Sequence, residues 1–480
     1  MLVMKFGGTS VGDARRVRES ARIALTRTGP NVLVVSACGG VTNLLLDAGQ
    51  AAARGDREGV RANVAEVHAR HENVLSGLGN PQLQAEARAV VDELHLSLDR
   101  TLDDIVTEGT LSAKLSDRLV SHGEKCMSVM MATTIRDMGV PAKYIFTDTV
   151  LVTDGRHGSA RPNREATRAK AAELVRPMID DGYTVVATGF IGHGPDGATT
   201  TLGRGGSDYS ATLLGAALDA TEVQIWTDVP GMLSADPRKV PTARVVSEVS
   251  YDEAQELAHF GAKVLHPRTI RPAVSQGIPV RILSTFQPTN AGTVVRETSP
   301  SQRIKATTAL KGLTLLTIDV PELEDLAGAA SAVFRVLHED RIEIIAVSQS
   351  SSRRRMTFIL DAQSEGCAVL APRIRASLDD IELEISCTDE VAVLAAVGEG
   401  AANTASSLST LLGVLNRASV PVLATSQQNS NAALVVVVPE AAADRAVQAV
   451  HDAMIGASRV SRRASSRRRS DLIGESLRVG

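Results

Sequence analysis

Two glycine-rich turns, far apart in the sequence, most constrain what this chain can fold into. The first turn, Lys5 to Val11, follows the apolar residues Leu2–Met4, so a short buried strand leads into a lysine and then two glycines. The second runs from Gly203 to Asp208 and contains an arginine and an aspartate. Because glycine has no side chain, backbone N–H groups in such turns can approach an anion closely. The pair therefore predicts a phosphate-binding site.

Neither turn matches a standard nucleotide-binding signature. The P-loop pattern places its lysine after the glycines, whereas Lys5 precedes Gly7, and no G-x-G-x-x-G opens a helix after the first strand. The charges distinguish these turns from ordinary ones. Lys5 and Arg204 supply fixed cations, and Asp208 can orient them or engage the metal of a nucleotide.

Composition excludes several classes of protein. With 480 residues, the chain has room for about two to four domains. Only 2% of the residues are aromatic, which leaves few side chains on which nucleic-acid bases could stack. The formal net charge of −4 also argues against a general polyanion binder, although the tail 459–480 is rich in arginine and serine. We expect this tail to be disordered and expect no nucleic-acid partner.

The cysteines and the apolar runs predict a cytoplasmic protein. Cys38, Cys126, Cys367 and Cys387 lie far apart and have no C-x-x-C spacing, so we expect thiols in a reducing compartment and no metal site. No apolar run reaches the length of a membrane span, and Met1 leads directly into a strand-like segment rather than a signal peptide.

The order of apolar segments predicts an α/β fold in the N-terminal part. Strand-like runs alternate with helix-like segments, which is typical of a largely parallel sheet with helices on both faces. Ligands of such sheets bind beyond the carboxyl ends of the strands, where both glycine turns would fall. Residues 57–120 have mainly helical patterns and lack strand-like runs, which predicts an added helical subdomain. The strand-like runs are Leu2–Phe6, Val32–Ser36, Thr184–Thr188 and Glu222–Thr227, and the helix-like segments include Ala14–Thr26, Gln82–Arg100 and Asp208–Leu218.

An internal duplication follows a polar stretch at Thr293–Ser301. The segments Leu313–Leu316 and Val391–Leu394 are offset by about the same interval as Ser348-Gln349 and Ser426-Gln427. Each copy is predicted to contain a strand, a helix and two more strands, which makes a small α+β unit with a helix on one face of its sheet. The helices are expected at Ala332–His338 and Ser409–Asn416, and the last strands at Met356–Leu360 and Ala433–Val438.

The ordered series of motifs resembles the aspartokinases of the amino acid kinase superfamily, and the duplication resembles two ACT domains. The resemblance implies an amino acid kinase domain at 1–298, a first ACT-like domain at 305–385 and a second at 386–458. Aspartokinases insert the first ACT unit within the second, so residues 299–304 can add a strand to the second. The matching stretches are Lys5–Ser10, Ser36-Ala37, Thr42-Asn43, Ser121–Lys125, Gly189–Gly192, Thr199–Ser210, Trp226–Gly231, Ala235–Arg238 and Phe260–Pro267.

By this resemblance, the chain transfers a phosphoryl group from ATP to the side-chain carboxylate of L-aspartate, the first step towards lysine, threonine and methionine. A carboxyl group with a pKa near ~4 is already an anionic nucleophile at neutral pH, so no general base is needed. The difficulty is to bring two anions together, which calls for lysine, arginine, backbone N–H groups and Mg²⁺. We expect Mg²⁺ to be held mainly by the phosphates of the nucleotide.

The resemblance also assigns roles to single residues. Lys5 and Asp208 are catalytic; Ser36, Thr42, Glu124, Phe190 and Arg204 bind aspartate, with Glu124 on its ammonium and Arg204 on a carboxylate. The nucleotide residues are Lys5, Gly7, Gly8, Thr9, Thr227, Asp228, Leu233, Asp236, Arg238 and Lys263. Leu233 stands where many relatives have an aromatic residue, so no adenine stacking is expected there. His266 is expected to cap or pack.

Two alternatives stay open from the sequence. One is a related kinase acting on acetylglutamate, glutamate or UMP, although such kinases are not expected to combine this Ser-His-Gly-Glu motif with two ACT-like units. The other is an amino-acid-sensing protein with an inactive kinase fold, against which the intact Lys5, Glu124 and Arg204 argue. We expect no fused homoserine dehydrogenase, and we expect a homodimer or higher oligomer formed through the ACT-like region.

The effector is predicted from the first ACT-like unit. Lysine-sensing relatives place a carboxylate on the strand before its polar turn, but Ile345 occupies that position here. Burying an unpaired ammonium there would be costly. Ser348, Gln349 and Ser350 offer hydrogen bonds that suit a small hydroxylated amino acid, and Gln-Ser-Ser-Ser resembles threonine-regulated members. The sequence therefore favours threonine over lysine as the inhibitor, although Glu343 or a partner subunit could supply the missing charge.

Overall fold

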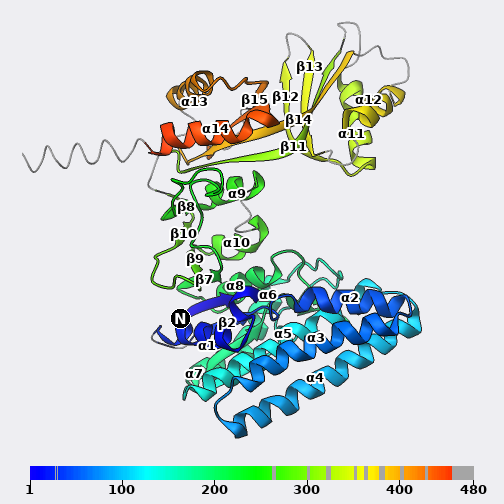
Figure 1. The fold of residues 1–480 in the computed structure, drawn as a ribbon, viewed down its shortest axis with the longest axis vertical. Coiled ribbons are helices and arrows are strands. Elements are labelled where there is room, and N and C mark those ends of the chain that lie inside the picture. Colours follow the sequence, from blue (N-terminus) through cyan, green and yellow to red (C-terminus); the bar gives the residue numbers. More distant parts are fainter. Residues whose placement is uncertain are drawn as a thin grey trace, which may run out of the picture. The chain divides into compact units, whose positions relative to one another are not determined.

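The protein divides into two compact units, which are described separately (Figure 1). The first contains Met1–Met232, Ser247–Tyr251 and Lys263–Thr298, and the second contains Leu233–Val246, Asp252–Ala262 and Ser299–Gly480. The predicted disordered tail, 459–480, lies outside the described residues. The computed structural model describes residues 1–27, 29, 31–261, 266–299, 303–320, 326–350, 354–361, 366–377, 384–400, 405–426 and 431–456.

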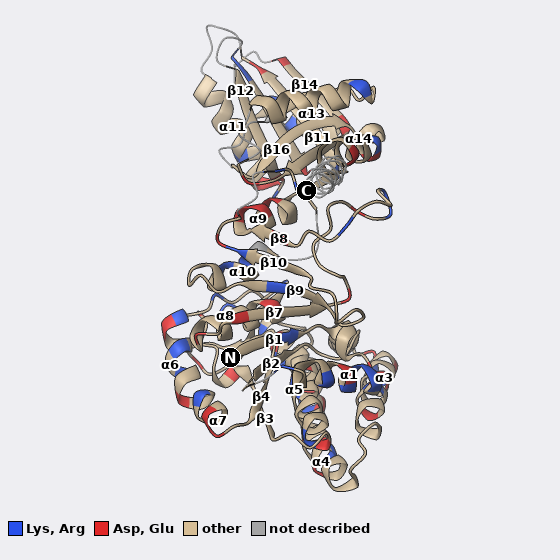
Figure 2. Cartoon of the chain, turned by 90° about the vertical axis from the view of Figure 1, so that its left-hand side faces the viewer, with Lys and Arg blue, Asp and Glu red and all other residues tan. Residues whose placement is uncertain are grey.

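The first unit is built on an eight-stranded sheet in the order β3-β4-β2-β1-β7-β9-β10-β8, which Figure 2 shows edge to edge. Neighbouring strands are parallel except for β9 and β10. This confirms the predicted α/β class, and the four predicted strands correspond to β1, β2, β4 and β7. The strands are β1 Leu2–Phe6, β2 Asn31–Val35, β3 Ala142–Ile145, β4 Thr184–Thr188, β7 Glu222–Thr227, β8 Glu248–Ser250, β9 Val280–Ser284 and β10 Thr293–Arg296.

The centre of this sheet is buried because its strands are almost wholly apolar. All residues of β2 and β4 are buried, as expected for strands covered on both faces. β1 lies between β2 and β7, so that Lys5 is beside Val34 and Ile225. Short helices and a hairpin complete the unit: α1 Ala14–Leu25, α6 Arg164–Leu174, α7 Arg176–Asp180, α8 Gly206–Ala217, α10 Pro267–Val274, and the strands β5 Ile191–His193 and β6 Thr199–Thr201.

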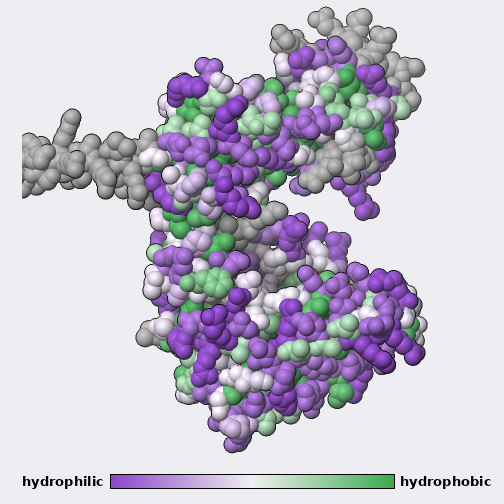
Figure 3. Space-filling view, in the orientation of Figure 1, coloured by the Kyte–Doolittle hydropathy of each residue, from purple (hydrophilic) through white to green (hydrophobic). Residues whose placement is uncertain are grey.

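The predicted helical subdomain, residues 57–120, contains α3 and α4 and the start of α5, and α2 precedes it. These helices are α2 Val41–Ala53, α3 Arg57–Ser76, α4 Pro81–Glu108 and α5 Ala113–Asp137. The start and end of α4 are encoded locally. Asn80 caps its first turn and Pro81 occupies the first helical position, while Gly109 ends it with a positive φ of 65°. The outer surface over α3 and α4 is mostly hydrophilic (Figure 3).

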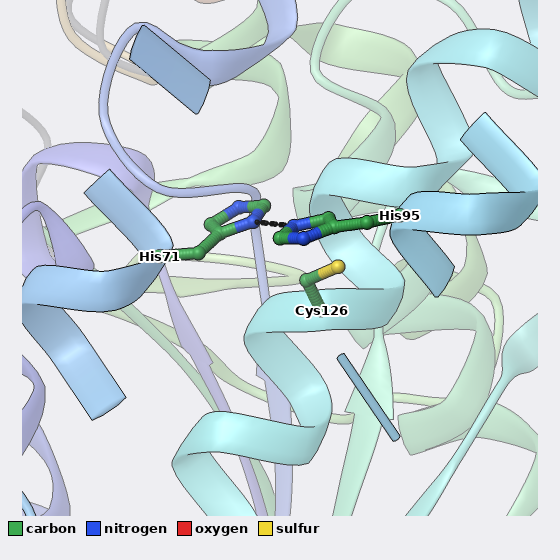
Figure 4. A group of neighbouring side chains, drawn as sticks. All are labelled: His71, His95 and Cys126. Atoms are coloured by element: carbon green, nitrogen blue, oxygen red, sulfur yellow. Dashed lines mark hydrogen bonds between the residues drawn. The ribbon is translucent and has the colours of Figure 1, made fainter. Parts of the chain in front are cut away.

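Three side chains meet between these helices: His71 from α3, His95 from α4 and Cys126 from α5 (Figure 4). Their ligating atoms lie within 4.8 Å of one another, so the group could hold a metal ion. His71 Nδ1 and His95 Nε2 already form a hydrogen bond of 2.9 Å. Burial lowers the pKa of His71 to about 3 and that of His95 to about 4, so both rings are neutral at pH 7.

The second unit contains a six-stranded antiparallel sheet in the order β12-β13-β11-β14-β16-β15. The central strands β11 and β14 pair along both halves of their length. Ala306–Leu310 of β11 pairs with the part of β14 that also pairs with β16, so each duplicated unit contributes a strand to the other. The strands are β11 Ala306–Asp319, β12 Glu343–Ser350, β13 Arg355–Asp361, β14 Glu384–Val397, β15 Ala424–Ser426 and β16 Ala433–Pro439.

Each duplicated unit contains one more helix than the sequence predicted. The predicted helices lie within α11, Leu326–Glu339, and α13, Ala405–Arg417, but α12, Gly366–Ala376, and α14, Ala443–Val450, follow the last strands. α12 contains Pro372, which hides its helical pattern, and α14 is only eight residues long. Both added helices pack apolar residues into the cores of their units, including Leu370, Ile374 and Val447.

One prediction about the cysteines is wrong. Cys367 at the start of α12 and Cys387 on β14 form a disulfide, whereas both were expected as thiols. Separation by 20 residues hid the pairing, because no C-x-x-C spacing marks it. Cys38 and Cys126 are buried free thiols, as expected. Among the helices that the structure describes, none is both long enough and apolar enough to cross a membrane.

A buried ion pair holds α9, Tyr251–His259, to the sheet of the second unit. Lys305 Nζ lies 2.6 Å from Glu253 Oε2, and their side chains are 9% and 0% exposed. The N–H of Glu399 donates to the other oxygen of Glu253 at 2.6 Å. Both charges are therefore compensated inside the unit.

We predict that Lys305→Met destabilises the second unit by about 3–5 kcal/mol, because it leaves the charge of Glu253 buried without its cation. Hydrogen exchange of β14 and β16, read by mass spectrometry, measures the change. The double variant Glu253→Gln/Lys305→Met should regain part of the protection. Equal exchange rates in the wild type and Lys305→Met would contradict the prediction.

Candidate active site

A cavity of about 760 Å³ in the first unit brings together all of the predicted catalytic and substrate residues. It lies where β1 and β2 end and α8 begins, at the carboxyl edge of the sheet, as the sequence predicted. The loop before α2 and the middle of α5 complete its wall. The predicted residues that line it are Lys5, Gly8, Ser36, Thr42, Glu124, Phe190, Arg204 and Asp208.

An ion pair joins the two glycine-rich turns. Lys5 Nζ lies 2.7 Å from Asp208 Oδ1, with 11% and 15% of the two side chains exposed. Lys5 extends from the central strand β1, and Asp208 belongs to the first turn of α8. Asp208 can therefore hold the ammonium group of Lys5 at the cavity, as predicted.

The second glycine-rich turn packs so closely on its neighbours that a side chain at Gly205 or Gly206 would be strained. A Cβ on Gly206 would lie 2.4 Å from the ring of Phe190, and Gly205 has a φ of 69°. Phe190 itself has a φ of 72°, which is uncommon for an aromatic residue, and its N–H donates to Ser210 Oγ at 2.9 Å. The position of Phe190 at the cavity is thus fixed by its contact with α8.

The glycines of the first turn differ in their roles. The N–H of Gly7 donates to the carbonyl of Trp226 at 3.2 Å, so it extends the pairing of β1 with β7. Gly8 lines the cavity, and a Cβ there would lie 3.0 Å from the carbonyl oxygen of Ala37. Gly7 and Thr9 are not among the residues that line the cavity.

Glu124 is the most unusual charged group of the site. Its side chain is only 3% exposed, and the N–H of Ala37 donates to its Oε1 at 3.2 Å. No described residue hydrogen-bonds to Oε2. Burial raises the pKa of Glu124 to about 8, so this carboxyl group is largely protonated at neutral pH. A cationic group beside Oε2 would favour the charged form.

The neighbours of Glu124 in the motif Ser121–Lys125 support the helix rather than the cavity. His122 contacts the carbonyl of Leu119 at 3.1 Å and the hydroxyl of Ser97 at 3.2 Å, and burial lowers its pKa to about 4. Lys125 pairs with Asp148 at 2.7 Å. Of this motif, only Glu124 lines the cavity.

Sequence reasoning missed Asp117, which supports the turn that carries Arg204. Its buried carboxylate accepts hydrogen bonds from Thr201 Oγ1 at 2.6 Å and from the N–H of Gly158, and His157 Nδ1 lies 2.9 Å away. A Cβ on Gly203 would lie 3.2 Å from the carbonyl oxygen of Gly158. Asp117 lies seven residues before Glu124 on α5, and this helical spacing was the available signal.

Of the predicted nucleotide residues, only Lys5 and Gly8 line this cavity among those that the structure describes. Thr227 ends β7 and donates to the carboxylate of Asp228 at 3.1 Å, but neither lines the cavity. Leu233, Asp236 and Arg238 belong to the second unit, where Asp236 and Arg238 pair at 2.8 Å. Lys263 lies outside the described residues. Their roles towards a nucleotide therefore stay predictions.

The predicted effector residues lie on β12 of the second unit. Ser348 and Gln349 are exposed and oppose Thr357 and Met356 of β13, while Ser350 is half-buried. Ile345 is buried, and Glu343 is exposed at the start of the strand.

Comparisons with known proteins agree with this geometry. The amino acid kinase family matches residues 1–284, and an ACT domain family matches residues 394–454. The chain is 32% identical to lysine-sensitive aspartokinase 3 of Escherichia coli, covering 94% of this chain and 98% of that one. It is 30% identical to a bifunctional aspartokinase/homoserine dehydrogenase of Haemophilus influenzae, of which it spans 57%.

Solved structures give the same result. The structure of E. coli aspartokinase III in complex with lysine and aspartate is similar to this chain with a TM-score of 0.78 and 31% sequence identity. The match covers 95% of this chain and 99% of the E. coli chain. The complex of that enzyme with aspartate and ADP has a TM-score of 0.76 at 31% identity, with the same coverage.

We predict that Glu124→Gln stabilises the first unit by an amount that grows as pH rises from about 5 to 8. The folded wild type keeps a proton that the unfolded chain, with its ordinary glutamate pKa, releases, so the wild type loses stability across this window and the glutamine variant does not. Urea unfolding followed by fluorescence of the single tryptophan, Trp226, measures the difference. A constant difference between pH 5 and pH 8 would contradict the raised pKa.

Proposed function

Because the chain belongs to the aspartokinases of the amino acid kinase family, we propose that it transfers the γ-phosphoryl group of ATP to the side-chain carboxylate of L-aspartate. The products are 4-phospho-L-aspartate and ADP. The match to an ACT domain supports regulation of this activity by an amino acid.

The charge pattern of the cavity is the observation that carries this proposal. Lys5 and Arg204 provide two cations, which suit the two carboxylates of the substrate or the transferred phosphoryl group. Glu124 provides a buried carboxyl group whose Oε2 has no hydrogen-bond partner among the described residues. An amino acid with two carboxylates and one ammonium group complements all three.

The reaction needs no proton transfer. An oxygen of the aspartate side-chain carboxylate attacks the γ-phosphorus, a new P–O bond forms, and the bond to the oxygen that bridges to the β-phosphate breaks. That oxygen leaves with its electron pair as part of ADP. In this proposal Lys5, oriented by Asp208, stabilises negative charge on the transferred group, which matters most in the transition state.

The proposed nucleotide residues are those that the family motifs identify: Lys5, Gly7, Gly8, Thr9, Thr227, Asp228, Leu233, Asp236, Arg238 and Lys263. ATP is supported by the relative that was solved with ADP. Mg²⁺ would accompany the nucleotide on its phosphates and reduce the repulsion between the two anions. Gly8 is a candidate for contact with the nucleotide because it lines the same cavity as Lys5, and a Cβ there would crowd the carbonyl oxygen of Ala37.

Glu124 distinguishes the proposed substrate from the alternatives. Acetylglutamate and UMP have no ammonium group, so they would leave Glu124 without a cationic partner. Glutamate has one but is longer by a methylene group. An inactive sensing protein is disfavoured because Lys5, Asp208 and Arg204 all lie at one cavity.

The wider role follows from the family. We propose that the product enters lysine, threonine and methionine biosynthesis, and that the chain forms a homodimer or higher oligomer through its ACT-like region. The cytoplasmic location stays a prediction, because a disulfide such as Cys367–Cys387 is unusual in a reducing compartment.

For the effector, we propose threonine rather than lysine, bound at Ser348, Gln349 and Ser350. Ile345 is buried and cannot pair with an ammonium group. Exposed Ser348 and Gln349 provide hydroxyl and amide groups on β12. Lysine is the competing candidate, because the E. coli relative is named lysine-sensitive and was solved with lysine.

We predict that Lys5→Ala folds normally but loses roughly 10²–10³ in kcat, because a group directed at the transferred phosphoryl acts in the transition state. An assay of ADP release with aspartate, glutamate, acetylglutamate and UMP measures the activity and identifies the substrate. Lys170→Ala, which removes an exposed lysine on α6 that pairs with Glu173, is the matched control. Near-normal turnover in a folded Lys5→Ala variant would refute the assignment, and preference for another substrate would refute the proposed reaction.

We also predict that threonine inhibits at lower concentration than lysine, and that Gln349→Ala weakens the inhibition by about tenfold through loss of a hydrogen bond. Titration of each amino acid into the same assay measures both effects. Inhibition by lysine at lower concentration, relieved by Glu343→Gln and unaffected by Gln349→Ala, would reverse the assignment.

A further inference from the structure

A second cavity, of about 720 Å³, lies beside the first in the same unit and is lined by six arginines. No aspartate or glutamate is among the residues that line it. The basic residues come from the loop before α6, the first residue of α6, the turn before α8, and α10 with its N-cap. They are Arg156, Arg161, Arg164, Arg204, Arg268 and Arg271, together with His266.

The charges of this arginine cavity are mostly uncompensated. Within the described part of the chain, only Arg156 has a carboxylate partner, Asp154, at the long distance of 3.8 Å. Arg164 donates to the hydroxyl of Ser275 at 3.1 Å, which adds no negative charge. Clustered guanidinium groups repel one another, and a bound anion removes this cost.

The backbone that carries these arginines is held in place. Asp154 accepts hydrogen bonds from the N–H groups of Arg156 and Arg161 at 3.1 and 3.0 Å, which closes the loop before α6. The turn before α8 packs on the start of α10, because a Cβ on Gly205 would lie 2.9 Å from Thr269 Cγ2. The cavity is therefore formed before any ligand arrives.

His266 also lines this cavity. Its side chain caps α10 by accepting from the N–H of Arg268, as the sequence predicted. Burial, followed by the charges of Arg268 and Arg204, lowers the pKa of His266 below its ordinary value. His266 is thus neutral at pH 7, and because its Nδ1 accepts from Arg268, its Nε2 carries the proton and can donate a hydrogen bond to an anion.

We propose that the arginine cavity binds an anion with several phosphate groups, and that this anion lowers the affinity of the enzyme for aspartate. A single carboxylate would leave most of the six guanidinium groups unpaired. Phosphate groups accept paired hydrogen bonds from arginine and carry more charge, so a di- or triphosphate can engage several of the six. The source can be a free polyphosphate or a nucleotide.

Arg204 connects the two cavities, because it lines both. A side chain that pairs with an anion in the arginine cavity is less available to a carboxylate in the first cavity. This coupling rests on the proposed role of Arg204 in aspartate binding, whereas the binding of the anion itself does not.

The first test is calorimetric titration of the whole protein with tripolyphosphate at physiological salt, without ATP or Mg²⁺. The double variant Arg268→Gln/Arg271→Gln should bind at least tenfold more weakly than the wild type. Arg54→Gln/Arg57→Gln, which removes two exposed arginines outside both cavities, should bind as the wild type does. Equal binding by the two double variants, or no binding by the wild type, would overturn the proposal.

Further ligands identify the chemical class. Pyrophosphate and a non-hydrolysable ATP analogue, if they bind in the arginine cavity, should bind Arg268→Gln/Arg271→Gln more weakly than the wild type. The one that binds the wild type more tightly shows whether the anion is a free polyphosphate or a nucleotide. Citrate, which carries three carboxylates, should bind at least tenfold more weakly than tripolyphosphate. Citrate binding of equal strength would overturn the assignment to phosphate groups.

The second test measures the coupling by the ADP-release assay. Tripolyphosphate should raise the KM for aspartate at least threefold in the wild type and not in Arg268→Gln/Arg271→Gln, whose basal kinetics should be unchanged. Loss of binding in the variant without any effect on KM in the wild type would refute the coupling alone. A protein that binds tripolyphosphate but phosphorylates no aspartate would refute the proposed function and leave the anion site standing.

Discussion

The ion pair between Lys5 and Asp208 is the contact on which the arrangement of the first unit depends. It ties the end of the central strand β1 to the first turn of α8, and so closes the cavity between two segments distant in sequence. Partial burial strengthens the pair relative to one in open solvent, because screening by water is reduced. The turn before α8 is packed closely against Phe190, because a Cβ on Gly206 would lie 2.4 Å from its ring.

Local sequence identified four of the eight strands of the large sheet, β1, β2, β4 and β7. The runs that became β1, β4 and β7 are short, apolar and bounded by turn residues, and their ends were predicted to the residue. The family motifs identified the candidate site residues, and those at the carboxyl edge of the sheet line one cavity. Asp117 was missed since its partners, Thr201 and Gly158, are remote in sequence, and a lone aspartate on a helix is usually solvated.

The second half depended more on contacts that sequence alone does not reveal. The disulfide between Cys367 and Cys387 joins a helix to a strand, and no spacing rule marks it. Likewise, α12 and α14 gain their stability from packing against their sheets rather than from a strong helical pattern. The family resemblance suggested that residues 299–304 add a strand to the second repeat, whereas the segment that pairs with its strand β14 begins at Ala306.

The exchange of strands between the duplicated units has an evolutionary consequence. Because β11 and β14 each serve both halves of one sheet, removal of either repeat would leave the other with an open edge and an incomplete core. A duplication of this kind cannot be reversed by a clean deletion. Descendants of such a chain must therefore retain both copies and diversify them by substitution, so that one repeat can specialise for a ligand while the other maintains the shared sheet.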